Sequence, residues 1–431
     1  MPVRPPAGAP AHPPPLVLPG SHFAAVIAWL VAGAAGLVAV APALAGGDVF
    51  SPRVFAVTHA FTLGVVTTAI FGALYQFFPV ALGVTLRSVR VGLIGFGLLL
   101  AGTLAIVAGF WTWTPRLQGI GWLLLFSAVG CVAWNLLPQR RRSKQHPMVG
   151  RYVSLGHSAL GIAMFLGLAR IGDAAGWWHL ERLGVVAAHY HLAAYGFAGL
   201  TAVGVGSRML PMFLVTDVRG GQWQLRWIAP AAAAGLLLFT VGAPQRLAPM
   251  KLLGGLLLLG AGALYLHLVG DYFRRRTVAR LDHGLSHVAA AFVLLAAAWL
   301  TGAALLAGLA PAHDPRWWAA YALVGVTGWL TLFVLGVLYR ILPFLLWMHV
   351  VGPRSGGGVP VQALSRPRWA LASLGLLVSG VALLSGAVAA GHPQAARAGA
   401  LLFLAGGLVT AVHWGRALLL GRRPPHAATT P

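Results

Sequence analysis

Histidines begin two long apolar segments of this 431-residue chain. His59 precedes AFTLGVVTTAIFGALYQFFPV, and His189 and His191 begin HYHLAAYGFAGLTAVGVGSRMLPMFLV. Neutral imidazole is a good axial ligand for heme iron and a common ligand for copper. The alternative is an interfacial histidine that hydrogen bonds to a neighbour or to a lipid headgroup. His189 and His191 project about 200° apart on a helix, so only one can point inward.

The two segments belong to an internal repeat. His59, His191 and Leu323 are separated by two equal steps of 132 residues. Glycine follows each of them at offsets 5 and 13, and proline follows at offset 20. His191 occupies the same position in the repeat as His59, so we expect His191 to be the inward-facing ligand and His189 to face solvent.

Further histidines repeat near the opposite ends of other segments. His22, His157 and His287 stand at equivalent points, and Asn135, His267 and His413 form a looser set. The five imidazoles favour either a second heme or copper site or ordinary polar contacts between helices. The chain then comprises three four-helix units over about 22–145, 150–276 and 284–421.

Composition predicts an all-α membrane protein. The chain is 58% hydrophobic, 9% charged and has a mean hydropathy of +0.81. Apolar runs long enough to cross a bilayer recur twelve times, without the alternation of barrel strands. The expected membrane domain is 22–421, with a Pro-rich disordered tail at 1–21 and a second tail at 422–431. The twelve expected spans are 22–46, 54–83, 89–112, 116–138, 150–172, 184–214, 224–244, 248–270, 284–309, 316–347, 367–391 and 394–421.

The net charge of +23 follows the membrane topology. With both termini in the cytoplasm, only eight of the 30 Lys and Arg residues lie outside. The clusters 140–144 and 274–276 fall inside. This bias is typical of a multi-pass protein of the bacterial inner membrane, with the lipid bilayer and not nucleic acid as its partner.

Glycines and arginines on the repeat helices have two interpretations each. Gly64 and Gly196 could let a heme lie against the backbone, or they could serve helix packing. Arg208 and Arg340, one turn before the repeat prolines, could pair with a heme propionate, or their side chains could extend to the lipid headgroups.

The twelve spans in three arcs, with THAFTLG around His59 and HYHLAAYGF around His191, resemble subunit I of the heme-copper oxidase superfamily. The closest branch is that of the C-type oxidases and nitric oxide reductases. The resemblance implies that the second span supplies an axial ligand of a low-spin heme b, which would be His59. It implies a metal ligand on the sixth span, which would be His191 or His189, and further ligands on the seventh and tenth spans.

The chain departs from that pattern at two spans. The tenth carries Leu323 where the repeat would place histidine, and the seventh, QLRWIAPAAAAGLLLFTVGAP, has none. Copper therefore lacks its usual three-histidine site. All seven acidic residues lie in loops or at helix ends, which argues against a proton-pumping terminal oxidase.

The resemblance implies a heme-binding protein for electron transfer or for handling dioxygen or nitric oxide. Its expected partners are cytochrome c or other respiratory subunits. Whether the chain is an enzyme stays open, and no catalytic residue is assigned. The alternative is a sensor, assembly factor or channel on a metal-free scaffold of the same architecture.

Overall fold

The computed structural model describes residues 14–138, 147–218, 222–355 and 360–422. Twelve of its helices are long and apolar enough to cross a membrane, and the described residues contain no strand. The all-α fold and the number of spans are therefore confirmed. The first helix starts at Val17, inside the segment assigned to the tail. Residues 1–13 of that tail, the cluster 140–144 and most of the second tail lie outside the described residues.

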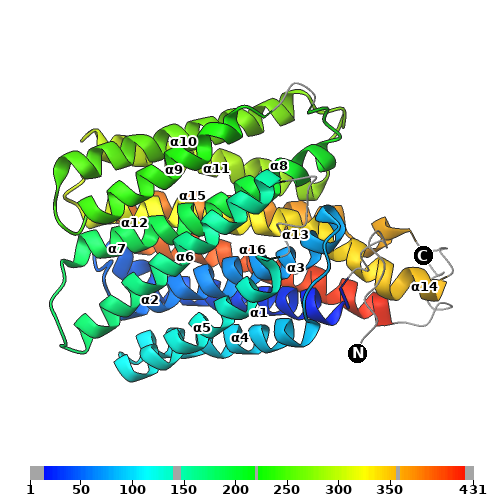
Figure 1. Cartoon of the computed structure of the whole chain (residues 1–431), viewed down its shortest axis with the longest axis horizontal. Helices are drawn as coiled ribbons and strands as arrows, with labels where there is room; N and C mark the ends of the chain where they lie inside the picture. Colours follow the sequence, from blue (N-terminus) through cyan, green and yellow to red (C-terminus); the bar gives the residue numbers. More distant parts are fainter. Residues whose placement is uncertain (1–13, 139–146, 219–221, 356–359, 423–431) are drawn as a thin grey trace.

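Nine spans are single helices that run roughly along one direction (Figure 1). They are α1 (Val17–Ala45), α4 (Val89–Trp111), α5 (Pro115–Leu136), α6 (Pro147–Ala174), α9 (Gln224–Gly242), α10 (Ala248–Arg274), α11 (His283–Leu306), α15 (Pro367–Ala390) and α16 (Pro393–Arg422).

The other three spans are each interrupted by a π-helical segment. These spans are α2 (Pro52–His59) to α3 (Thr68–Leu82), α7 (Arg182–His191) to α8 (Leu200–Leu214), and α12 (Pro315–Leu323) to α13 (Thr331–Leu346). After α13 the chain continues through a π turn (Trp347–Val351) into α14 (Gly352–Ser355), and a 3-10 helix (Val361–Leu364) precedes α15.

The π-helical segments begin directly after His59, His191 and Leu323. They are Ala60–Thr67, Leu192–Gly199 and Val324–Leu330, and each contacts the other two. The spans that contain them are the most buried. In the apolar stretch of each of these spans, 67%, 78% and 78% of the residues are buried, against 28–44% in the other spans. The repeat helices thus form the centre of the bundle. The three-unit symmetry of the whole chain stays a prediction.

Threonines explain part of the π conformation. A π turn leaves carbonyl groups without their usual α-helical donors. The hydroxyls of Thr67 and Thr68 donate to the carbonyls of Thr62 and Leu63 at 2.8 and 2.9 Å. Thr331 donates to the carbonyl five residues before it at 2.9 Å. Such segments are rare and frequently lie at functional sites.

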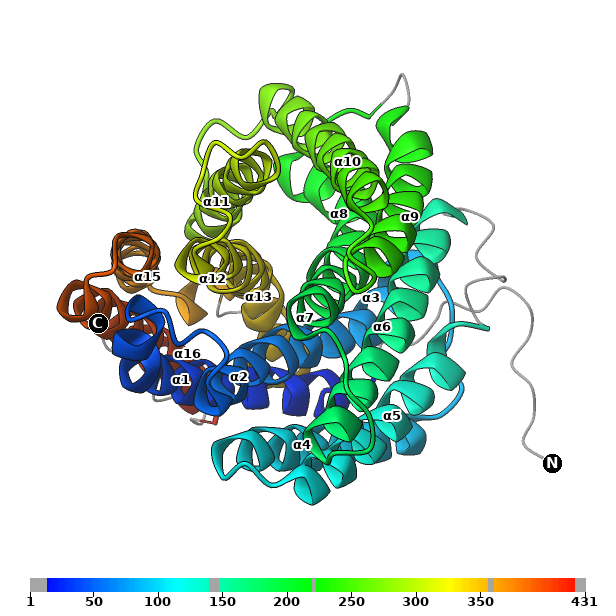
Figure 2. The ribbon, with the colours of Figure 1, turned by 90° about the vertical axis from the view of Figure 1, so that its left-hand side faces the viewer.

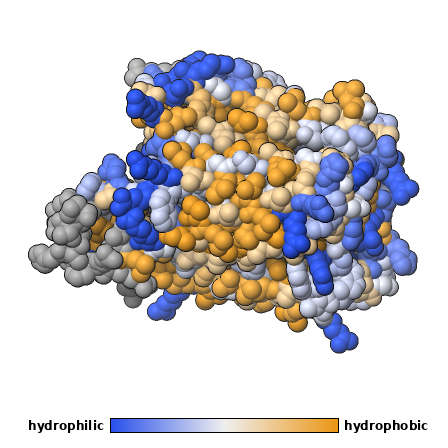
Figure 3. Space-filling model, turned by 180° about the vertical axis from the view of Figure 1, so that it is seen from behind, coloured by the Kyte–Doolittle hydropathy of each residue, from blue (hydrophilic) through white to orange (hydrophobic). Residues whose placement is uncertain are grey.

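The surface agrees with a membrane environment. Hydrophobic side chains occupy the middle of the molecule, and hydrophilic ones gather toward its two ends (Figure 3). The bilayer is therefore the environment of this chain.

Candidate functional site

A cavity of about 720 Å³ lies at the end of the bundle where α2, α7 and α12 begin. Figure 2 looks onto this end, with α7 near the centre of the helices. His59, His189 and His191 all line the cavity, so the structure brings together the three histidines singled out in the sequence. Most of the remaining wall is apolar and includes Val40, Leu44, Phe110, Phe239, Leu305 and Trp318.

His59 is the last residue of α2. Its Nδ1 lies 2.7 Å from the carbonyl oxygen of Phe55, one turn earlier. A carbonyl only accepts, so Nδ1 carries the proton and Nε2 keeps its lone pair. The ring stacks on Phe110 of α4 with ring centres 5.0 Å apart. The His59 imidazole is thus fixed in both orientation and tautomer.

His189 is the nearest imidazole to His59. Their ring centres are 6.2 Å apart and their planes meet at 43°. His189 Nδ1 donates to the carbonyl oxygen of Ala163 on α6 at 2.8 Å, so its Nε2 also carries a lone pair. His189 thus lines the cavity beside α6. The sequence had predicted that it faces solvent.

His191 occupies a different side of α7. Its ring centre is 4.5 Å from that of Phe239 on α9, and its Nε2 is 3.3 Å from the hydroxyl of Tyr321 on α12. Nδ1 donates to the Ala187 carbonyl at 2.8 Å. Nε2 therefore accepts the Tyr321 hydroxyl proton. His191 lies inward, as expected, but its lone pair is engaged by a tyrosine.

The cavity rim carries more positive than negative charge. Arg170, Arg246 and Lys251 line it together with one carboxylate, Glu181. The Arg246 guanidinium is 3.5 Å from Glu181, and Arg170 pairs with Asp173. Cations at the mouth of an apolar cavity favour a ligand with an apolar body and anionic substituents.

Asp314 fixes the start of α12 just outside the membrane span. Its carboxylate accepts from the Arg316 backbone N–H at 2.9 Å and from the guanidinium at 2.6 Å. Hydrogen bonds from Arg316 lower the pKa of the Asp314 carboxyl. Because the carboxylate stays ionised to lower pH than a free aspartate, this cap continues to hold α12, and with it Tyr321, in mildly acidic conditions.

Gly64 and Gly196 lie in helix contacts. A Cβ on Gly64 would come within 2.4 Å of the Trp29 ring on α1, and one on Gly196 within 2.7 Å of Ala159 on α6. Neither glycine is among the residues that line the cavity. Their places agree with the packing interpretation.

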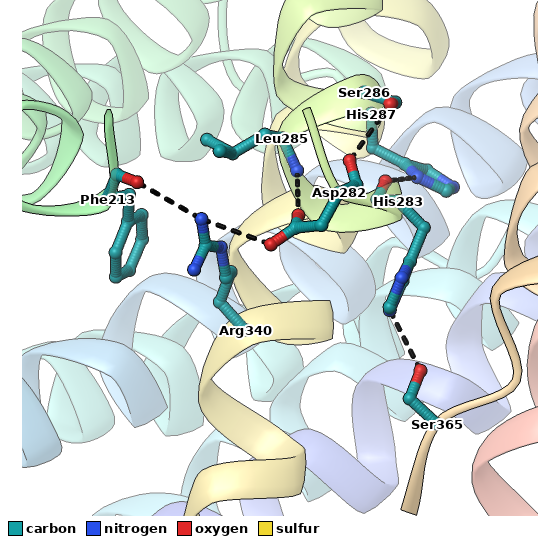
Figure 4. A network of polar contacts seen from close by, with 8 residues as sticks. All are labelled: Phe213, Asp282, His283, Leu285, Ser286, His287, Arg340 and Ser365. Carbon is teal, nitrogen blue, oxygen red and sulfur yellow. Dashed lines mark hydrogen bonds and ion pairs between the residues drawn. The ribbon is translucent and has the colours of Figure 1, made fainter. Parts of the chain in front are cut away.

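Arg340 lies toward the opposite end of the bundle, where it joins three elements (Figure 4). Its guanidinium is 3.1 Å from the Asp282 carboxylate and 3.1 Å from the carbonyl of Phe213, in the last turn of α8. Asp282 in turn caps α11 by accepting from Leu285 N–H at 2.8 Å. Arg340 therefore pairs with a carboxylate of the chain itself. Arg208, near the C-terminal end of α8, is exposed.

His22, His157 and His287 share a local geometry but not a site. In each, Nδ1 donates to the carbonyl four residues earlier at 2.7–2.8 Å. Their rings meet different neighbours: Tyr75 and Phe96 for His22, Phe71 and Phe197 for His157, and Tyr339 for His287. The repeat thus places these imidazoles equivalently, each in surroundings of its own.

The other two members of this set lie in the C-terminal parts of α10 and α16. His267 is half-exposed and accepts from the Gln224 amide at 3.0 Å. The ring centres of His413 and Tyr339 are 5.4 Å apart, and the Ser365 hydroxyl is 3.5 Å from His413 Nε2. The same hydroxyl is 2.8 Å from His283 Nε2 (Figure 4). Across the described residues, no three His, Cys, Asp or Glu side chains are arranged to hold a metal ion.

The variants His22→Gln and His157→Gln are therefore expected to retain the iron and copper content of the wild-type protein. Each imidazole serves its own helix contact, so its removal leaves any metal elsewhere untouched. Elemental analysis of the purified proteins by mass spectrometry measures this directly. Loss of either metal in both variants would show that these histidines share a metal site.

Three residues of the cavity were missed by the sequence analysis. Tyr190, Tyr321 and Phe110 contact the histidines but lie in ordinary aromatic positions of apolar segments. Tyr190 carried a usable signal, because it stands between His189 and His191.

Comparison with known proteins adds no assignment. No protein-family model matches the chain, and no curated protein matches it at a significant level. The resemblance to the heme-copper oxidases thus rests on architecture and on the two short histidine motifs.

Proposed function

We propose that the chain is a membrane-bound electron-transfer protein that holds heme b between His59 and His189. The observation that carries the proposal is the pair of cavity-lining imidazoles, 6.2 Å apart between ring centres, each with Nδ1 held by a backbone carbonyl. Metal-ligating histidines commonly donate their second ring nitrogen in this way.

The residues fit the group by size and chemistry. Imidazole nitrogens bind metals at about 2.0–2.1 Å, so two imidazoles on opposite sides of one ion have ring centres about 6 Å apart. A cavity of about 720 Å³ lies within the range of cofactor sites. The apolar wall suits a macrocycle, and Lys251 at the rim suits one of its carboxylates, whereas Arg170 and Arg246 already pair with Asp173 and Glu181.

The chain's own residues would then set the properties of the site. Phe55 and Ala163 would keep both imidazoles in the tautomer that presents Nε2, and Phe110 would hold the His59 ring in place. The apolar wall would exclude water and raise the cost of a net charge. Bound iron would supply one-electron chemistry.

With His59 and His189 both holding the heme, the site would favour electron transfer over the handling of dioxygen or nitric oxide, because the iron would have no ligand position left for a gas. The corresponding candidate for a second metal, His191, instead accepts a hydrogen bond from Tyr321.

We place the protein in the inner membrane of a bacterium with both termini in the cytoplasm, because of the charge bias of its loops. A C-terminal alkaline phosphatase fusion tests that orientation, since the enzyme is active only outside the cytoplasm.

The test of heme binding is a reduced-minus-oxidised absorption spectrum of the detergent-purified protein, combined with a pyridine hemochrome assay. We expect heme b at close to one per chain. A protein produced with sufficient heme supply that lacks these bands would refute the proposal and favour a sensor, assembly factor or channel on a metal-free scaffold.

A further inference from the structure

Two arginines flank a hydrogen bond that joins the starts of α6 and α9, at the end of the bundle opposite the cavity. The buried Tyr152 hydroxyl donates to the Leu225 carbonyl at 2.8 Å. The residues next to this pair in the sequence, Arg151 and Arg226, are both exposed. The two helices lie side by side at the periphery of the bundle (Figure 2). The bond therefore holds two arginine-bearing segments next to each other.

Both arginines continue the lipid-facing stripe of their own helix. Eleven residues separate Arg151 from Ile162, and eleven separate Arg226 from Leu237. Eleven residues make about three helical turns, so each pair shares a face. Ile162 and Leu237 are 48% and 65% exposed, as expected of side chains that face lipid. The rise over eleven residues is about 16 Å, or roughly half of a hydrocarbon core. Each stripe thus has the length of one lipid leaflet.

The charge at this place is positive and uncompensated. Within the part of the chain that the structure describes, neither of the two guanidinium groups forms an ion pair. The first turns of α6 and α9 contain no acidic residue, so the positive ends of both helix dipoles add to the arginines. Asp271, which the Gln224 amide contacts at 3.2 Å, already pairs with Arg274. The exposed Trp227 beside Arg226 is a side chain typical of the membrane interface.

We propose that the starts of α6 and α9 form a binding site for an anionic phospholipid, with phosphatidylglycerol as the simplest case. The phosphate accepts hydrogen bonds from the guanidinium groups of Arg151 and Arg226, which suit its oxygens. The acyl chains lie along the two stripes toward Ile162 and Leu237. Basic side chains beside transmembrane helices attract anionic headgroups, so a lipid without net charge binds more weakly. The site lies at the other end of the bundle from the proposed heme site and does not depend on it.

The test is native mass spectrometry of the full-length protein in a neutral detergent, titrated with phosphatidylglycerol or with phosphatidylcholine of the same acyl chains. We expect phosphatidylglycerol to bind more tightly. The double variant Arg151→Gln/Arg226→Gln is expected to weaken its binding about 10- to 30-fold, as for the loss of two interfacial charges. Arg90→Gln/Arg368→Gln is the matched control, because it removes the same charge from exposed positions at the starts of α4 and α15. It should bind as the wild type does.

Equal affinity of the wild type for the two lipids would overturn the proposal, and so would an unchanged affinity in Arg151→Gln/Arg226→Gln. Equal losses in the two double variants would also contradict it, because the general charge of this end would then attract the lipid. A fourth contrary result is displacement of the lipid by inorganic phosphate, which would indicate a site for a soluble anion. All four side chains are exposed, so wild-type elution on size-exclusion chromatography is expected for both variants.

Discussion

Replacing either His59 or His189 by alanine is expected to abolish the low-spin heme spectrum of the purified protein. Each change removes one of the two imidazoles proposed to hold the heme, whose ring centres are 6.2 Å apart, and a heme held by one imidazole alone would lose the low-spin spectrum. His191→Ala is expected to retain the low-spin spectrum, because the His191 ring lies against Phe239 and Tyr321 on another side of α7. Absorption spectra of the three variants, normalised by hemochrome content, measure the difference.

This prediction separates two ligand assignments. The sequence register favours His59 with His191, whereas the structure favours His59 with His189. A His189→Ala protein with an intact low-spin spectrum would contradict the structural assignment. Wild-type elution on size-exclusion chromatography is the control that a lost spectrum reflects ligand removal and not unfolding.

The variant Gly64→Ala is expected to lower the free energy of unfolding by about 1–3 kcal/mol, the usual cost of overpacking a filled contact. Its new Cβ would lie 2.4 Å from the Trp29 ring and 2.9 Å from the Trp29 Cβ, so α1 and the π-helical segment must move apart. Thermal unfolding in detergent, with and without added heme, measures the loss.

Gly97→Ala is the matched control, because Gly97 is exposed on α4 and no atom lies within 4 Å of its Cβ position. That change should leave stability equal or slightly increased, since alanine is the better helix former. If Gly64 instead made room for a porphyrin, Gly64→Ala would lose heme while the stability of the heme-free protein stayed unchanged.

Much of the fold could be predicted from the sequence, because an apolar run of about 20 residues is by itself enough to indicate a membrane span. All twelve expected segments correspond to membrane-length helices, with ends that differ by a few residues. The start of α1 at Val17 was missed because prolines precede it and resemble a disordered tail. Pro19 lies in the first turn, where a proline costs a helix little.

The candidate site was only partly predictable. The repeat indicated that His59 and His191 lie at one end, and they do line one cavity. The choice between His189 and His191 assumed that one side of α7 faces inward. In the structure both sides are covered, by α6 for His189 and by α9 and α12 for His191. Sequence periodicity cannot reveal which neighbours cover a central helix.

The π-helical segments also could not be predicted from the sequence. A regular period of 3.6 residues was assumed from each histidine to the following proline. The widened turns at Ala60–Thr67 and Leu192–Gly199 rotate His59 and His191 relative to the α-helix that follows each segment, α3 and α8. The faces of Gly64 and Gly196 therefore could not be assigned correctly by counting residues from His59 and His191.

Near-infrared magnetic circular dichroism of the oxidised, purified protein tests whether His59 and His189 hold a heme, because its charge-transfer band identifies the axial ligands of a low-spin heme. We expect the band of a heme with two imidazole ligands, and its loss in both His59→Ala and His189→Ala. A band from any other ligand pair, or a bis-imidazole band that persists in His189→Ala, would contradict it.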